Sequence, residues 1–248
     1  MRARKAGRFK LIYIISMSGI YTLWSCGKAI YGSYLVKDYR SYIDRVLNKW
    51  AVRIMALINV SIRVKGGNNL PIDSKRPVIV MCNHSSLYDV PVAILAIDSS
   101  FRFIAKKELF SIPIFGSAIK KGEIISIDRQ SRTQAMKDLQ RAKEKMLDGV
   151  TIWIAPEGTT TKDGKLAKFK KGGFHVAIDT SALIVPIVIK DIHKVQADYD
   201  LDIYTNQEIE VEICKPVDAE NYKLSQRAEL MNKVRTKMLT ALGQEESL

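Results

Sequence analysis

The residues best suited to chemistry are His84 and Asp89, five positions apart in CNHSSLYDVP. On one continuous helix this spacing would separate the two side chains by about 140°. They can meet only if His84 precedes a helix that begins near Ser85 or Ser86 and its ring points back toward the first turn. A carboxylate bonded to one imidazole nitrogen raises the basicity of the other, which can then remove a proton from a hydroxyl. The alternative is a helix-capping histidine and a solvated acid.

Two further segments place polar side chains after apolar runs. In KKGEIISIDRQS the run ends at Asp128 and Arg129, and an arginine there could bind phosphate through a bidentate contact. A surface ion pair is the alternative. In TIWIAPEGTTTKDGKLAKFKKGG the run leads to Glu157 and Gly158. Glu157 could accept hydrogen bonds from substrate hydroxyls, and Gly158 would let a ligand approach the backbone.

The lysines that follow Gly158 could gather phosphate or an acidic carrier protein. The alternative for this whole segment is a tight turn followed by a solvated basic loop. The sequence alone does not decide between these two interpretations.

An alternation of strands and helices must position these segments. Runs rich in Val and Ile predict strands at 60–64, 78–82, 102–105, 123–127, 151–155, 183–189 and 208–214. The plainest helix opens at Ser131, with Gln134 three residues later as a capping box, and ends at Gly149. Such alternation predicts an α/β fold, a largely parallel sheet covered by helices. Ligands of such folds gather at the carboxyl ends of the strands.

The first 60 residues predict a two-helix membrane anchor, with the α/β domain following from 61 to 248. Residues 1–10 carry basic but no acidic side chains, and residues 11–27 carry no charge. From Ile43 to Ile58 apolar residues recur at helical spacing, with Arg45, Lys49 and Arg53 on the other side. Such a basic amphipathic helix would lie in the interface and face anionic headgroups. A surface helix of the globular core is the alternative for this second helix.

The first helix is a marginal span. Because basic residues flank the apolar run on both sides, we expect the two helices to dip into one leaflet. A single full span is the alternative. Either arrangement places the protein at the cell membrane, and we expect its cytoplasmic side, since the cysteines suggest a reducing compartment.

The composition narrows the classes of function. The chain has 248 residues, of which 47% are hydrophobic and 26% charged, and its net charge of +13 favours an anionic partner such as a membrane surface. Nucleic acid is not expected, because the lysines are dispersed. Cys26, Cys82 and Cys214 are widely spaced, so neither a disulfide framework nor a zinc site is suggested.

Other enzyme classes lack their sequence signatures here. The chain has no GxSxG elbow, no GxGxxG or GxxxxGKS loop and no HExxH. His175 and His193 have no second His or Cys at ligand spacing, so we expect no metal site.

Taken together, the segments resemble the glycerolipid acyltransferase family. NHSSLYD at 83–89 matches its NHxxxxD signature. IDR at 127–129, PEGT at 156–159 and VPI at 185–187 look like its second, third and fourth motifs, in the right order. The resemblance covers about 77–189, and within the family it is nearest to the bacterial enzymes that acylate 1-acylglycerol 3-phosphate (lysophosphatidic acid) to give phosphatidic acid.

The resemblance implies a role for each matching residue. His84 would be the general base on the 2-hydroxyl of lysophosphatidic acid, and Asp89 would orient it. That hydroxyl would attack the thioester of acyl-CoA or acyl-carrier protein directly, with no cofactor. Arg129 would contact the phosphate of the acceptor.

The remaining substrate contacts are also implied by the resemblance. Glu157, Gly158 and Thr159 of PEGT would hold the glycerol phosphate, and Lys106, in the AKKEL run, is a further phosphate ligand. The chain departs from the common PEGTR pattern at Thr160, and a lysine of the following loop would then replace the missing arginine.

Two alternatives to this function stay open. One is a related acyltransferase with another acceptor, such as glycerol 3-phosphate, a lyso-ornithine lipid or a lysophospholipid. The other is a peripheral lipid-binding protein that uses the same phosphate pocket without chemistry.

Overall fold

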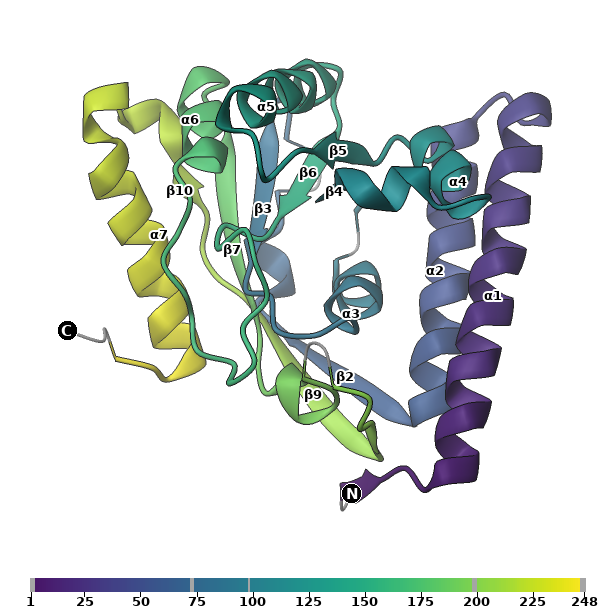
Figure 1. Ribbon diagram of the computed structural model, residues 1–248. Helices are drawn as coiled ribbons and strands as arrows, with labels where there is room; N and C mark the ends of the chain where they lie inside the picture. Colours follow the sequence, from purple (N-terminus) through teal and green to yellow (C-terminus); the bar gives the residue numbers. More distant parts are fainter. Residues whose placement is uncertain (1–2, 72–73, 98, 198–199, 246–248) are drawn as a thin grey trace.

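The computed structural model describes residues 3–71, 74–97, 99–197 and 200–245. Its centre is an eight-stranded sheet with helices on both faces (Figure 1). The strand order is β2-β9-β7-β3-β6-β4-β5, with β10 paired to β7. The bounds are β2 (Val60–Lys65), β3 (Val78–Cys82), β4 (Phe101–Lys106), β5 (Ile125–Ile127), β6 (Thr151–Ile154), β7 (Leu183–Ile189), β9 (Gln207–Ile213) and β10 (Val217–Asp218).

The sheet is largely parallel, as predicted. The pairs β3–β6, β3–β7, β4–β6, β4–β5 and β2–β9 are parallel, whereas β9 and β10 each run antiparallel to β7. The central strands β3 and β7 read VIVMC and LIVPIVI, because both of their faces are covered. A small ribbon pairs β1 (Arg4–Lys5) with β8 (Tyr204–Thr205).

Helices cover the two faces of the sheet and form two apolar cores. One core contains α2 and α3, and the other contains α5, α6 and α7. The helices are α1 (Arg8–Leu35), α2 (Tyr39–Ile58), α3 (Asp89–Ala96), α4 (Phe115–Lys121), α5 (Arg132–Leu147), α6 (Gly172–Asp179) and α7 (Arg227–Leu242). Short 3-10 turns are η1 (Gly67–Asn69), η2 (Lys107–Ser111), η3 (Ile192–Lys194), η4 (Ala219–Asn221) and η5 (Leu224–Gln226).

Two predicted boundaries shift for local reasons. The predicted capping box of α5 forms only in part: the Ser131 side chain accepts from the Gln134 amide, but the Gln134 side chain donates to Asp138. The predicted strand from residue 123 begins only at Ile125, since Glu123 lies in the left-handed region with a φ of 61°. The helix expected near Ser85 or Ser86 begins later, at Asp89, and the preceding segment turns without forming helix.

The N-terminal helices pack against the domain that follows them. Helix α2 lies between α1 and α3 (Figure 1), and its Ala51, Ile54 and Ile58 belong to the same buried cluster as Val80 of β3. The apolar face of α2 therefore packs in the protein core, as the core-helix alternative predicts. The predicted division at residue 60 falls between α2 and β2, where the packing is continuous.

Helix α1 carries the unpartnered apolar surface. Among the described residues it alone is long and apolar enough to cross a membrane, and only 11% of its most apolar window is buried. Its outward side chains are more than half exposed: Phe9, Ile12, Tyr13, Ile15, Ile20, Leu23, Trp24, Tyr31, Tyr34 and Leu35. On its inner side Trp50 of α2 donates from Nε1 to the Thr22 hydroxyl at 3.0 Å.

Candidate active site

The carboxyl end of β3 delivers the candidate base. Asn83, the first residue after β3, is 4% exposed and bridges to the last residue of β7. Its Nδ2 donates to the Ile189 carbonyl at 3.0 Å, and its Oδ1 accepts from the Ile189 amide at 2.8 Å. These two hydrogen bonds fix the backbone from which His84 projects. The sequence pattern around Asn83 does not predict this bridge, because Ile189 is 106 positions away.

His84 and Asp89 meet, as their spacing predicted for a histidine that precedes the helix. The His84 Nδ1 lies 2.6 Å from the Asp89 Oδ2. The same oxygen accepts from the amides of Ser85 at 2.8 Å and Ser86 at 2.9 Å. These amides fold residues 83–88 over the first turn of α3. With Nδ1 bonded to the carboxylate, Nε2 is the nitrogen that can accept a proton.

The two members of the pair differ in exposure. Asp89 is fully buried, whereas the His84 side chain is 18% exposed and so opens to solvent. Within the described part of the chain, the second carboxylate oxygen of Asp89 has no hydrogen-bond partner, and neither has the buried Ser85 hydroxyl. The hydrogen bonds of Asp89 to His84, Ser85 and Ser86 are therefore all made by one oxygen, Oδ2.

Glu157 lies behind the dyad as a cross-link. It follows β6 and is 1% exposed. Its Oε1 accepts from the His84 amide at 3.0 Å and its Oε2 from the Ala167 amide at 2.6 Å. Burial raises the pKa of Glu157 to about 7, and the two amide donors offset only part of that rise. Both oxygens thus bind the protein itself, and a contact with substrate hydroxyls stays a prediction.

The second and third predicted segments come together at the mouth of the site. The Arg129 Nη1 donates to the Gly158 carbonyl at 3.0 Å, and the arginine side chain is exposed. Gly158 has a φ of 71°, a conformation that favours glycine. Thr159 is exposed beside it, and the Thr161 amide donates to the His84 carbonyl at 2.9 Å. Arg129, Gly158 and Thr159 therefore share one rim with the dyad.

Lysines border this rim on the strand β4 side. Lys106 ends β4 and its side chain is 51% exposed, with Nζ 3.9 Å from Glu108. Its neighbour Lys107 is held by Asp128 at 2.6 Å, which also holds down the pKa of the Asp128 carboxyl. The predicted phosphate ligands thus come from three strand ends, β4, β5 and β6. Parallel strands bring them to the same edge of the sheet.

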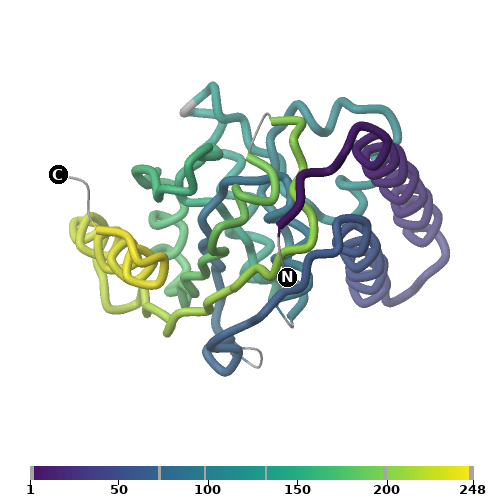
Figure 2. Tube along the Cα trace, turned by 90° about the horizontal axis from the view of Figure 1, so that it is seen from below, coloured from purple at the N-terminus to yellow at the C-terminus, as the bar shows by residue number. Residues whose placement is uncertain are grey.

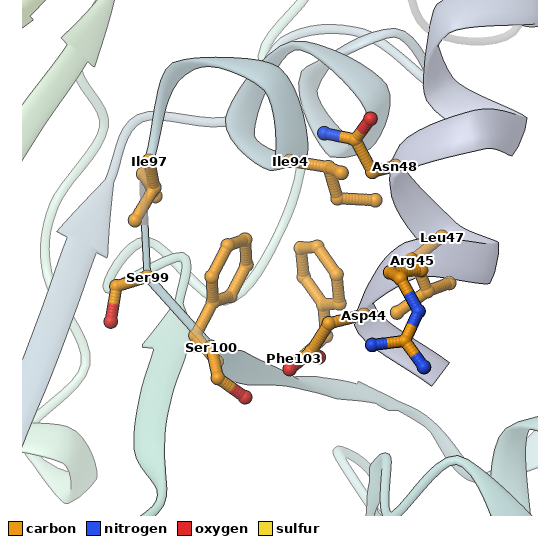
Figure 3. A pocket seen from close by; sticks show the side chains of 10 residues that line it. Asp44, Arg45, Leu47, Asn48, Ile94, Ile97, Ser99, Ser100 and Phe103 are labelled. Atoms are coloured by element: carbon orange, nitrogen blue, oxygen red, sulfur yellow. The ribbon is translucent and has the colours of Figure 1, made fainter. Parts of the chain in front are cut away.

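An aromatic series leads from the dyad into the domain. The His84 ring meets the edge of the Trp153 ring at 6.3 Å between centroids, and Trp153 meets Phe103 at 5.2 Å. Phe103 lines a cavity of about 330 Å³ between α2, α3 and β4 (Figure 3). Figure 3 shows Ile94 of α3 facing Phe103 across this space, with Asn48 and Arg45 at the α2 side. The lining is apolar at Ile94 and Phe103 and polar at Arg45 and Asn48.

Comparisons with known proteins identify the family of the chain. The acyltransferase family model matches residues 61–190, which include every predicted site residue. The crystal structure of the 1-acyl-sn-glycerophosphate (LPA) acyltransferase PlsC from Thermotoga maritima is similar, with a TM-score of 0.80, 26% identity and 97% of each chain covered.

Curated relatives are similar over different lengths. The chloroplastic 1-acyl-sn-glycerol-3-phosphate acyltransferase LPAT1 of Arabidopsis thaliana is 29% identical over 96% of this chain, which spans 65% of that protein's length. The 1-acyl-sn-glycerol-3-phosphate acyltransferase of Haemophilus influenzae is 29% identical over 71% of this chain and 72% of its own length.

Proposed function

Because the chain belongs to the acyltransferase family, we propose that it transfers a fatty acyl group from a thioester to the 2-hydroxyl of lysophosphatidic acid. The product would be phosphatidic acid, in phospholipid biosynthesis. The observation that carries this proposal is the 2.6 Å contact between His84 and the buried Asp89 at the end of β3. The names of the relatives support lysophosphatidic acid as the acceptor.

The proposed reaction needs one general base. His84 Nε2 takes the proton of the 2-hydroxyl as its oxygen attacks the thioester carbonyl. The C–O bond forms, the tetrahedral oxyanion collapses, and the C–S bond breaks. The imidazolium then returns the proton to the departing thiolate, so the products are an ester and a free thiol. The Asp89 carboxylate stabilises the imidazolium while it lasts.

The acceptor phosphate would bind at the rim. Arg129 supplies a planar guanidinium suited to two phosphate oxygens, and Lys106 a second cation. Gly158 and Thr159 would face the glycerol backbone. We propose that Glu157 acts mainly by position, because it joins the His84 amide to the loop that reaches Ala167.

The fatty acyl chain of the donor would lie along the Trp153 and Phe103 rings. Apolar pockets favour alkyl chains through the burial of their surface. The support is the continuous aromatic contact from His84 to the cavity shown in Figure 3. The donor of this chain would be acyl-CoA or acyl-carrier protein.

We also propose that α1 holds the protein on the membrane, on the cytoplasmic side where soluble thioesters are found. Its support is the exposed apolar side of α1 together with Lys28, which lies 5.4 Å from the Trp24 ring. Cations and aromatic rings at one level are typical of the interface between lipid and water.

The experiment that tests the reaction measures release of free thiol by the purified protein. Acyl-CoA and then acyl-carrier protein serve as donors, and lysophosphatidic acid is compared with glycerol 3-phosphate. Release that requires lysophosphatidic acid and is lost in His84→Ala is the expected result. Thiol release only with another acceptor would keep the reaction and change the assigned acceptor. No release with any combination of donor and acceptor would favour the lipid-binding alternative.

A further inference from the structure

A second apolar surface lies outside α1, on the connection from β4 to α4. Three side chains of this connection are exposed although they are apolar: Leu109 at 36%, Ile112 at 45% and Ile114 at 53%. We call these three residues the apolar rim. They follow directly after Lys106 and Lys107, the cations at the end of β4.

The backbone holds Ile114 outward in a costly conformation. Ile114 has a φ of 65° and a ψ of −56°, and the Phe115 amide donates to the Pro113 carbonyl at 2.7 Å. This is a γ-turn of the positive-φ form, which is rare and strained, above all for a β-branched residue. Strain of this kind persists where the surroundings enforce it, and it clusters at functional sites.

The surroundings of the turn are rigid. Phe115 packs against the cluster that contains Cys26 and Ile43. Gly116 lies so close to the Phe110 carbonyl that a Cβ atom would stand 2.1 Å from its oxygen. These contacts hold the residues that follow the turn, whereas the Ile114 side chain itself is 53% exposed. Burial of the Ile114 side chain therefore does not offset the strain.

The connection that carries the apolar rim leads into α4, which packs against α1. Lys121 Nζ of α4 lies 4.4 Å from the Tyr34 ring centroid. Figures 1 and 2 both show α4 alongside α1. Tyr31 and Tyr34 of α1 are 69% and 72% exposed. In the sequence, lysines flank the apolar rim on both sides: Lys106, Lys107, Lys120 and Lys121.

We propose that the apolar rim inserts into the same lipid leaflet as α1, so that the α/β domain has a membrane contact of its own. This inference rests on the proposed anchoring by α1. An anionic lipid surface fits better than a protein partner, because apolar tips flanked by cations complement acyl chains and headgroups together. Insertion at this point would hold Lys106 at the level of the lipid phosphates.

The test uses the full chain with vesicles of phosphatidylcholine and phosphatidylglycerol. Single cysteines at Ile112, Ile114, Leu23 and Leu201 carry an environment-sensitive dye, and the labelled parent chain serves as blank for the native thiols. Leu23 reports on α1, and Leu201 is a matched control, 72% exposed on a loop before β8. Quenching is measured with lipids that carry a doxyl group on the acyl chain.

The expected result is quenching at Ile112, Ile114 and Leu23 but not at Leu201. Quenching at Leu23 without quenching at Ile112 and Ile114 would overturn the rim contact and keep the anchor. Absence of quenching at all four sites would overturn both, while thiol release with detergent-dispersed acceptor would still report on the reaction. A blue shift at Ile112 that depends on protein concentration without lipid would show self-association instead.

A kinetic arm separates insertion from folding. In Ile112→Ser/Ile114→Ser, we expect kcat/KM with vesicle-embedded acceptor to fall about tenfold, because two partly buried apolar contacts with lipid are lost. With detergent-dispersed acceptor it should stay within about twofold of the parent chain. The control variant Leu147→Ser/Leu201→Ser should match the parent in both assays. An equal loss in both assays for the rim variant would contradict insertion.

Discussion

Asp89 binds three donors through one carboxylate oxygen. A substitution can therefore keep the hydrogen bonds that fix the geometry of the dyad and remove the negative charge. The Oδ2 atom holds His84, Ser85 and Ser86, whereas Oδ1 has no hydrogen-bond partner among the described residues. An asparagine whose amide oxygen takes the place of Oδ2 would keep these three bonds. Its amide nitrogen would replace the oxygen that makes none. The negative charge would be lost, and two N–H groups would be buried without an acceptor among the described residues, which lowers stability but leaves the geometry of the dyad in place.

We therefore expect Asp89→Asn to leave the fold and substrate affinity nearly intact and to lower kcat by roughly 10²- to 10⁴-fold. The physical reason is that the imidazolium formed during attack would lose its counter-charge. The measurement is kcat and KM from thiol release, with thermal unfolding as the control for folding. Unchanged kcat would remove the Asp89 charge from the mechanism.

Glu157 should make stability depend on pH. Its folded pKa of about 7 lies above the ordinary value of 4.5, because burial disfavours the charged carboxylate. The protonated form therefore stabilises the folded state fully below about pH 4.5, and this contribution is lost as pH rises through about 7. Glutamine does not titrate, and it leaves one buried amide without an acceptor.

For Glu157→Gln we expect a lower Tm at every pH, with the gap to the parent chain largest near pH 5 and smaller near pH 8. The measurement is Tm by scanning calorimetry across this range. Glu208→Gln, at an exposed position of β9, is the matched control and should follow the parent curve. Parallel curves for Glu157→Gln would show that Glu157 keeps its ordinary pKa in the fold.

The site residues differ in how far the sequence predicts them. His84 and Asp89 follow from their spacing, because a histidine just before a helix can reach the first turn. Asn83 has its partner in Ile189, 106 positions away, and local patterns do not report such a bond. Glu157 was expected to face the substrate, and sequence has no signal for the two amides that its carboxylate binds.

At the scale of elements, a buried ion pair joins α2 to the sheet. Arg102 of β4 is 1% exposed, and its Nη1 donates to Asp44 of α2 at 2.7 Å. Glu123 lies 3.8 Å from the same guanidinium, and its bonds to Arg40 lower its pKa to about 2. An arginine in a sequence is normally predicted to be exposed, because arginine side chains are mostly exposed in folded proteins. The pattern FRFIAK therefore predicts the strand but not this junction.

Removing one partner of that pair should be costly. For Asp44→Ala we expect the free energy of unfolding to fall by about 3 kcal/mol, since the buried Arg102 loses its hydrogen-bonded counter-charge and keeps only the more distant Glu123. Glu208→Ala breaks the exposed pair with Arg63 and should cost less than about 0.5 kcal/mol. Urea unfolding measures both variants. Equal costs would mean that water solvates Arg102 in the variant.

Substitution of Ile114 in the γ-turn should affect stability and vesicle binding differently. Ile114→Gly removes strain of about 1–3 kcal/mol and adds about 1 kcal/mol of backbone entropy to the unfolded chain. We expect the Tm to stay equal or to rise, while binding to anionic vesicles weakens. Calorimetry and vesicle sedimentation check the two halves. A clear fall in Tm would show that the Ile114 side chain packs inside the protein.

The sequence pattern also does not predict the direction of each strand in the sheet. The runs that form β7 and β9 are both apolar enough to predict strands, yet β9 runs antiparallel to β7 and parallel to β2. The alternation in QEIEVEI indicates a strand with one solvated face, but it carries no information on direction. That choice is made by the connection through residues 190–206 and by pairing with a strand from the other end of the chain.

At the scale of the whole molecule, α1 can be tested without disturbing the core. Deleting both N-terminal helices would uncover the apolar cluster that α2 shares with β3. Ile20→Glu/Leu23→Glu instead changes two side chains of α1 that are each 55% exposed. We expect this variant to lose its binding to vesicles. Its Tm and its activity on detergent-dispersed acceptor should equal those of the parent chain. Sedimentation with vesicles measures the first effect, and full binding would exclude α1 as the anchor.

The pairing of the two chain ends has a consequence for synthesis. Arg4 of β1 pairs with Thr205 of β8, and β2 pairs along its whole length with β9. On the ribosome, the apolar helix α1 emerges long before β9 exists, so the sheet cannot close until most of the chain has been translated. During that interval the lipid surface is the apolar environment within reach of α1. The bilayer would then act first as a folding partner, and refolding from denaturant should yield more native protein when vesicles are present.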